Sequence, residues 1–195
     1  DLARAMIIPG MLTMGVMMEI ISGGIDVSFP AISMLSMYAT LELLLKTEYD
    51  GPVALAFAVA TMIGLCLGLI NGALICWLKL PAFIITLGTS SIYLGFMQAV
   101  LKSHTSSLLP GPVSRMVKSF LLTVTNQELG ISSSLPSVFV FLIIIVAFTA
   151  FLLKYTMLGR GIYALGGDPV AAERAGFHVN GIRLFVYGFM GALAG

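Results

Sequence analysis

Charged side chains are scarce in this sequence. Lys, Arg, Asp and Glu make up 10% of its 195 residues, whereas a soluble domain usually carries about a quarter. Hydrophobic residues make up 58%, which is the composition of a membrane protein. The formal net charge is +1, so no overall electrostatic field favours nucleic acid or an acidic substrate as a partner.

Side chains that build catalytic or metal sites are also few. Cys66 and Cys76 lie in one apolar stretch, where a thiol is most simply a small hydrophobic group and implies neither a disulfide framework nor a metal site. His104 and His178 fall outside the apolar runs, and the patterns G-x-S-x-G and H-E-x-x-H are missing. The phosphate-binding pattern G-x-x-x-x-G-K-S/T is missing too. We therefore expect no catalytic residues, no metal and no nucleotide bound by this chain.

Six apolar runs approach the length of about 20 residues that a helix needs to cross a bilayer. They predict an all-α fold, a polytopic transmembrane helical bundle in a single domain over residues 1–195, with spans at 5–21, 31–45, 52–78, 83–101, 136–153 and, incomplete, 184–195. Because the chain starts at Asp1 and its last run stops at Gly195, we expect a fragment truncated at both ends. In the long connection at 102–135, PVSRMVKSFLLTV suits a helix lying in the membrane interface or an ordinary loop helix.

Glycines recur at every fourth position in the third span. Gly64, Gly68 and Gly72 share one helix face, and the same spacing returns at Gly191 and Gly195. Small residues at this spacing let a neighbouring backbone approach closely. We interpret these glycines as helix-packing positions.

The stretch GGIDVSFP (Gly23–Pro30) interrupts the first apolar region. Its glycines adopt conformations closed to other residues and its proline removes a backbone donor, so we expect a broken helix near residues 22–30. Asp26 or Ser28 could cap the helix that restarts near Pro30. The alternative is a broken helix lining a cavity at membrane depth, which other polar side chains could also face: Asn71, Thr86, Thr89, Ser90 and Gln98.

The segment LGRGIYALGGDPVAAERAGFHVNGIR contains a complete set of helix-boundary signals. Asp168 is a good N-cap, Pro169 suits the first helical position, and Gly176 suits the position just past the end. These residues predict a helix of about two turns, with small alanines at 171, 172 and 175. Since so short a helix is marginal by itself, it docks either in a groove of a partner protein or on its own protein.

Three motifs in the order GGIDVSFPAISMLS, GLINGALICWLKLPAFIITLGTSSIYLG and GRGIYALGGDPVAAERAGF carry a resemblance to a known family. The chain resembles the membrane-spanning permease subunits of bacterial ABC importers for simple sugars, the ribose, xylose, galactose and autoinducer-2 group. The resemblance runs along nearly the whole chain. It implies a multi-pass protein of the bacterial plasma (inner) membrane, surrounded by lipid, that moves a sugar by alternating access.

The resemblance also implies partners. They are a second permease subunit, a cytoplasmic ABC ATPase that binds the ATP, and an extracytoplasmic sugar-binding protein. It makes the loop 154–183 cytoplasmic and its part 158–183 the segment that couples to the ATPase. The residues implied in coupling are Gly159, Arg160, Gly166, Gly167, Asp168, Pro169, Ala171, Ala172, Ala175 and Gly176. Along the substrate path we expect polar side chains that could face the cavity beside the broken helix: Asp26, Ser28, Asn71, Thr86, Thr89 and Ser90.

The chain departs from the family at several positions. Relatives more often have Val-Gly at Phe29 and Pro30, Asn at Asp168 and an apolar residue near Glu19. An ion-coupled secondary transporter that uses Glu19 and Asp26 as cation sites is the alternative function, although such a transporter has no use for a capped docking helix.

Overall fold

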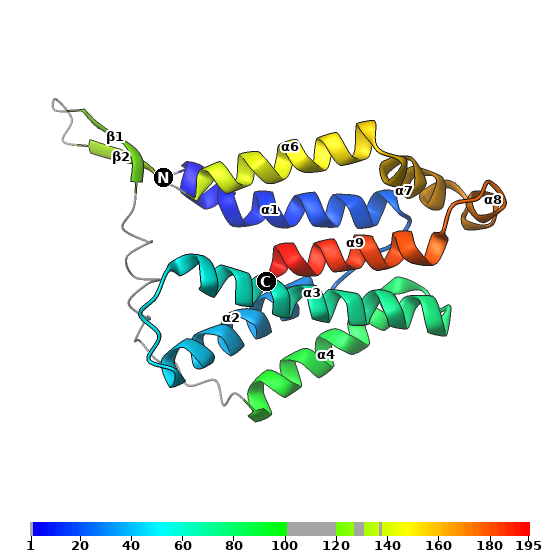
Figure 1. Ribbon diagram of the computed structural model, residues 1–195, viewed down its shortest axis with the longest axis horizontal. Coiled ribbons are helices and arrows are strands. Elements are labelled where there is room, and N and C mark those ends of the chain that lie inside the picture. The colour runs from blue at the N-terminus through cyan, green and yellow to red at the C-terminus, as the bar shows by residue number, and fades with distance from the viewer. Residues whose placement is uncertain (1, 101–119, 127–130, 137) are drawn as a thin grey trace.

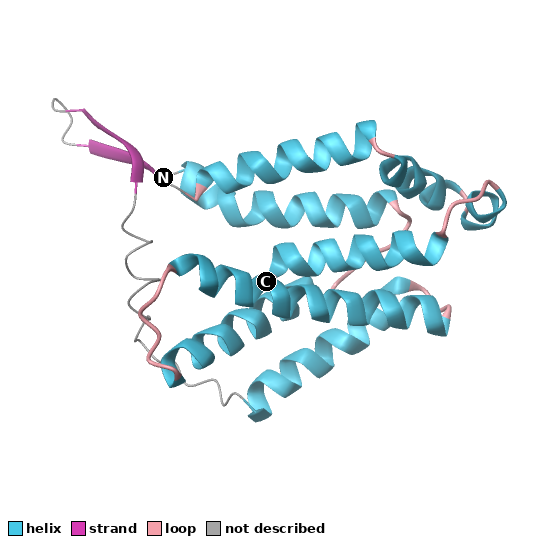
Figure 2. Ribbon diagram, in the orientation of Figure 1, coloured by secondary structure: helices cyan, strands magenta, loops and turns pink. Residues whose placement is uncertain are grey.

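The computed structural model of the protein describes residues 2–100, 120–126, 131–136 and 138–195. Over these residues the chain is mostly helical, and the long helices lie side by side in a bundle (Figure 1; Figure 2). The predicted helical bundle is therefore confirmed. The helices are α1 (Leu2–Ile21), α2 (Phe29–Lys46), α3 (Val53–Leu78), α4 (Ala82–Val100), α6 (Phe139–Tyr155), α7 (Met157–Gly167), α8 (Pro169–Arg174) and α9 (Val179–Ala194).

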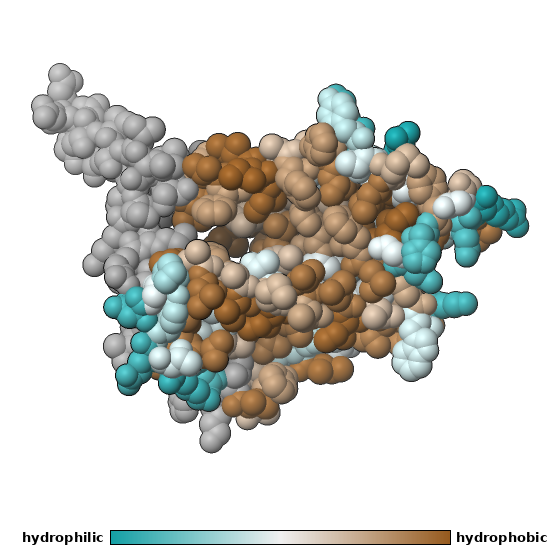
Figure 3. All heavy atoms as spheres, in the orientation of Figure 1, coloured by the Kyte–Doolittle hydropathy of each residue, from teal (hydrophilic) through white to brown (hydrophobic). Residues whose placement is uncertain are grey.

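The sides of the bundle are apolar. In the space-filling view, brown covers the flanks of the long helices, and hydrophilic side chains gather at the two ends (Figure 3). Many large apolar side chains point outward, among them Ile8, Phe57, Met62, Ile84, Ile92, Phe141, Ile144 and Phe151. An apolar flank between polar ends is the surface that a lipid bilayer requires.

Length and composition mark individual spans within the described part of the chain. Helices α3 and α4 are long and apolar enough to cross a membrane, and the pair α6 and α7 meets the same criterion as one span bent by 75°. Shorter apolar helices run over Ala5–Ile21 and Val179–Ala194.

A two-stranded hairpin lies at one end of the bundle, beside the start of α1 (Figure 1; Figure 2). Strands β1 (Phe120–Asn126) and β2 (Ile131–Pro136) pair antiparallel, with Thr123 opposite Ser134. The predicted interfacial helix in PVSRMVKSFLLTV is wrong over its last five residues, 120–124, which lie in β1. The sequence Thr-Val-Thr in β1 has β-branched side chains, which favour strands over helices. The remainder of that predicted helix lies outside the described residues.

Helices α3 and α9 cross at close range through their glycines. A Cβ atom added at Gly68 would lie 2.9 Å from the Cα of Gly191, and one added at Gly191 would lie 2.8 Å from the Cα of Gly68. Gly64 meets Gly191 and Gly195 in the same way, and Gly72 meets the backbone of Leu184. Both helices thus supply bare backbone to the contact, so neither can gain a side chain there without moving the other.

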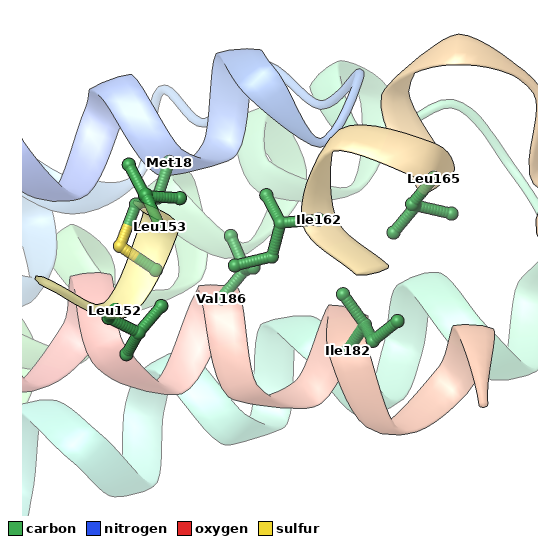
Figure 4. Close-up of a cluster of buried hydrophobic side chains, with 7 residues drawn as sticks. All are labelled: Met18, Leu152, Leu153, Ile162, Leu165, Ile182 and Val186. Atoms are coloured by element: carbon green, nitrogen blue, oxygen red, sulfur yellow. The ribbon is translucent and has the colours of Figure 1, made fainter. Parts of the chain in front are cut away.

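A cluster of buried apolar side chains fixes the end of the bundle where α7 lies. Met18 of α1, Leu152 and Leu153 of α6, Ile162 and Leu165 of α7, and Ile182 and Val186 of α9 form this cluster (Figure 4). Because four helices contribute to it, α7 is held against the bundle. We call this end of the bundle the α8 end, because α8 lies beside α7 there (Figure 1).

Candidate functional site

The break between α1 and α2 is an ordered turn. Helix α1 ends at Ile21, and the backbone N–H of Gly24 donates to the carbonyl of Glu19 at 2.9 Å. Gly23 has a φ of +81°, in the left-handed region that favours glycine. The predicted interruption of the helix is confirmed. The chain turns back after α1 at the α8 end and enters α2 within the bundle (Figure 1).

Asp26 holds the backbone where α2 begins. Its Oδ1 accepts a hydrogen bond from the backbone N–H of Ser28 at 2.5 Å. Ser28 is the N-cap of α2 and makes no side-chain cap of its own. The aspartate therefore satisfies a backbone donor just before the helix, and the serine hydroxyl stays free for another contact.

That contact begins a buried polar network. The Ser28 hydroxyl accepts from Nδ2 of Asn71 on α3 at 2.6 Å, and Oδ1 of Asn71 accepts from the hydroxyl of Tyr93 on α4 at 3.0 Å. All three residues are buried, with Ser28 and Asn71 fully enclosed. Three helices are joined through one asparagine, which uses both ends of its amide.

A second anchor ties the turn to α4. The hydroxyl of Thr86 accepts from the backbone N–H of Val27 at 3.3 Å and donates to the carbonyl of Ile25 at 3.4 Å. Thr89 bonds only to the carbonyl of Thr86 in its own helix. Ser90 is half-buried outside the network, and Gln98 is exposed. The structure thus brings together four of the predicted path residues with Thr89 beside them, and leaves Ser90 and Gln98 apart.

Sequence reasoning did not select Tyr93 or Tyr187. A tyrosine in an apolar helix needs a partner for its hydroxyl when it is buried, and Tyr93 and Tyr187 are only 6% and 2% exposed. This requirement could have pointed to a tyrosine with a buried hydroxyl, but the sequence does not show which of the six tyrosines is buried.

Asn71→Ala is expected to lower the free energy of unfolding by about 1–3 kcal/mol, because the hydroxyl of Ser28 would stay buried without its donor. The measurement is denaturant unfolding of the full-length protein in detergent. Ser91→Ala on α4 is the control, since Ser91 is exposed and bonds only to the carbonyl of Leu87 in its own helix. Equal stability of the two variants would contradict the role of Asn71 as a link between helices.

A cavity of about 800 Å³ opens at the α8 end. The α1–α2 turn lines it at Ser22 and Gly24, and α9 lines it at Arg183 and Tyr187. Further lining comes from the end of α3 and from α8 with the segment that follows it, at Cys76, Lys79, Val170, Glu173 and His178. The turn after α1 therefore forms part of the wall of a polar space beside α8.

Helix α7 leaves α6 at a sharp bend and was not expected from the sequence. The hydroxyl of Thr156 accepts from the backbone N–H of Gly159 at 3.0 Å and so caps the new helix. A Cβ at Gly159 would lie 2.6 Å from the Cα of Leu153, and a Cβ at Gly166 would collide with the carbonyl of Ile21. The glycines that lower helix propensity are thus the ones that let α7 lie close to its neighbours.

Helix α8 has the predicted boundaries. Oδ1 of Asp168 accepts from the backbone N–H groups of Val170 and Ala171 at 2.8 and 3.2 Å, and Pro169 is the first helical residue. Gly176, past the end, has a φ of +89°. The helix itself spans six residues, so it closes its hydrogen bonds with the cap residues on either side.

Most of the residues implied in coupling lie on the surface. Ala172 is 3% exposed and packs inward, and Gly159 is buried as well. A Cβ at Gly167 would meet nothing within 4 Å. The exposed positions are Arg160, Gly166, Gly167, Asp168, Pro169, Ala171, Ala175 and Gly176. Their docking role stays a prediction. Over the described residues, no group of three or more His, Cys, Asp or Glu side chains could hold a metal ion.

The profile of a family described as "Branched-chain amino acid transport system / permease component" matches residues 1–195. The chain is similar to the autoinducer 2 import system permease protein LsrC of Shigella flexneri, with 37% identity over 190 residues, 95% of this chain and 51% of the relative. The protein of the same name from Escherichia coli K12 / DH10B is 36% identical over the same shares. That from Photorhabdus luminescens is 30% identical over 95% of this chain and 53% of the relative.

The chain therefore spans about half the length of the curated relatives that it matches. No solved structure matches it.

Proposed function

Because the chain belongs to the branched-chain amino acid transport system permease family, we propose that it is part of the permease subunit of an ATP-driven ABC importer. The subunit forms the translocation path for a small polar solute in the bacterial inner membrane. A separate ATPase binds and hydrolyses the ATP, since the chain lacks the phosphate-binding pattern G-x-x-x-x-G-K-S/T.

The observation that carries the proposal is the placement of α8. This capped helix is exposed at one end of the bundle and follows α7, which packs against side chains of three other helices, α1, α6 and α9. A short, exposed helix on a rigid support presents a defined shape to a partner. We propose that the ATPase binds α8 and the adjoining surface of α7, and that Gly167, Asp168, Pro169, Ala171 and Ala175 are in contact with it.

The solute is proposed to be a sugar-like molecule of the autoinducer 2 type, because the similar proteins are autoinducer 2 import permeases. Asp26, Ser28, Asn71 and Thr86 are proposed to shape the path by holding the α1–α2 turn in place; Thr89 and Ser90, which do not contact the turn, are proposed to line the path on α4. Further partners are a second permease subunit and an extracytoplasmic solute-binding protein. The proposed role is transport of the solute, and we assign no catalytic residue to it.

Uptake into liposomes tests the proposal. The full-length permease is reconstituted with its ATPase and binding protein, ATP is enclosed, and accumulation of labelled autoinducer 2 is measured. We expect accumulation that requires ATP and stops when the ATPase is omitted. Uptake driven by a pH or sodium gradient in liposomes without the ATPase would overturn the proposal and support the ion-coupled alternative.

A further inference from the structure

Glu19 is a buried acid near the end of α1. Its side chain is fully enclosed, at 0% exposure, and neither carboxyl oxygen has a hydrogen-bond donor among the described residues. An ionised carboxylate without donors is costly inside a protein, and more so within a membrane. Burial therefore favours a neutral, protonated Glu19.

The neighbour of Glu19 is a second acid. The carboxyl groups of Glu19 and Asp26 interact electrostatically across the α1–α2 turn. Ionised carboxylates only accept hydrogen bonds, so a hydrogen bond between these two groups requires a proton on one of them. Without it, two like charges would lie side by side in a site of low dielectric constant.

The surroundings decide which acid carries the proton. Asp26 accepts a hydrogen bond from the backbone N–H of Ser28 at 2.5 Å. Hydrogen bonds of this kind stabilise the charged form of a carboxyl group. Glu19 receives no such bond, so the proton resides on Glu19 and is donated to Asp26.

Tyr187 provides a second, independent observation at the Glu19 and Asp26 pair. Its hydroxyl is buried without a hydrogen-bond partner, interacts electrostatically with both acids and would collide with a Cβ at Gly24 in the turn. Tyr187 also lines the cavity at the α8 end. Tyr187 thus brings a buried hydroxyl without a hydrogen-bond partner close to both acids, and the same residue lines the cavity.

The other ionisable groups near the site do not neutralise it. Tyr187 interacts electrostatically with Arg183, one turn earlier on α9, and with Cys76 on α3. Tyr93 on α4 interacts electrostatically with Asp26. Among the described residues, no lysine or arginine forms a salt bridge with Glu19 or Asp26. Within the described part of the chain, no positive side chain therefore neutralises the pair directly, and a proton can take that role.

We propose that Glu19 and Asp26 form a binding site for one proton, held in a hydrogen bond from the Glu19 carboxyl to the Asp26 carboxylate and reached from the cavity past Tyr187. The proton comes from water and leaves the pair with a single negative charge. It links α1 to the start of α2 and keeps the turn closed. The site goes beyond the proposed transport function and does not depend on it.

Infrared spectroscopy of the full-length protein at neutral pH tests the site directly. We expect a carbonyl stretching band of a protonated carboxyl group, lost in Glu19→Gln and shifted in frequency in Asp26→Asn, because the acceptor changes from a charged to a neutral oxygen. Asp168→Asn is the control: Asp168 is exposed, so this change should leave the band unaltered. A wild-type spectrum without the band, or a band unchanged in Glu19→Gln, would overturn the proposal.

Melting temperature as a function of pH provides the second measurement. The stabilisation by the shared proton is complete only below the pKa of about 4.3 that a glutamate has in an unfolded chain, and it decreases as the pH rises above that value until the folded protein loses the proton as well. The wild-type melting temperature should therefore fall as the pH is raised from mildly acidic to alkaline values, and Glu19→Gln should lack that component of the fall. The same fall in both proteins would contradict the shared proton. Neither measurement uses transport, so failure of this proposal and failure of the proposed function are separate results.

Discussion

Gly191→Leu is expected to prevent stable folding of the permease. A Cβ at this position would collide with the carbonyl of Gly64 and lie 2.8 and 2.9 Å from the Cα and N of Gly68. These are backbone atoms, so the clash cannot be relieved by a change of rotamer and α3 must move away from α9. Overpacking a core costs about 1–3 kcal/mol and occasionally more, and we expect the upper end or beyond, because the contact has backbone on both sides.

The measurement is the yield and melting temperature of the full-length protein after detergent extraction. Gly88→Leu is the matched control: a Cβ at Gly88 on α4 would meet nothing within 4 Å, so the same side chain should be accommodated. Gly191→Ala should fall between the two. If Gly191→Leu accumulates and melts like Gly88→Leu, the close approach of α3 and α9 is not what holds this part of the bundle together.

Gly167→Trp is expected to abolish ATP-driven uptake and leave the protein folded. The position lies at the junction of α7 and α8, and a Cβ there would meet nothing within 4 Å, so the chain itself has room for the larger side chain. If the ATPase covers this surface, an indole would hold the two proteins apart. A loss of at least about tenfold in affinity for the ATPase, or roughly 1.4 kcal/mol, is expected.

The experiment compares liposome uptake and co-purification of the ATPase for Gly167→Trp and Gly167→Ala. The alanine variant should behave like the wild type, and both variants should keep the wild-type melting temperature. Gly166→Ala provides the contrast, because its Cβ would collide with the carbonyl of Ile21 and should lower stability. Normal uptake by Gly167→Trp would exclude this surface from the contact with the ATPase.

Local signals in the sequence predicted the long helices and three helix boundaries well. The break at Gly23 and the ends of α8 follow from residues whose backbone preferences act within one turn: a glycine with positive φ, an Asp cap and a proline. Apolar runs marked the long helices because a span must be apolar along its full length.

Contacts between distant segments could not be predicted from the sequence. Asn71 and Ser28 are 43 residues apart, and nothing in either segment says that the amide meets the hydroxyl. Helix α7 was missed because its glycines read as loop residues, whereas tertiary packing against α1 and α6 overrides their low helix propensity. The proximity of Glu19 to Asp26 likewise depends on how the turn folds back, which the spacing of seven residues alone does not fix.

The 75° bend between α6 and α7 directs α7 across the α8 end of the bundle. Helix α7 begins after Thr156, and near its other end Gly166 lies against the backbone carbonyl of Ile21. Displacement of α8 would therefore be delivered to the last residue of α1, immediately before the turn that Asp26 and Thr86 anchor. If a partner moves α8, as proposed above, the displacement would reach that turn through the backbone contact between Gly166 and Ile21.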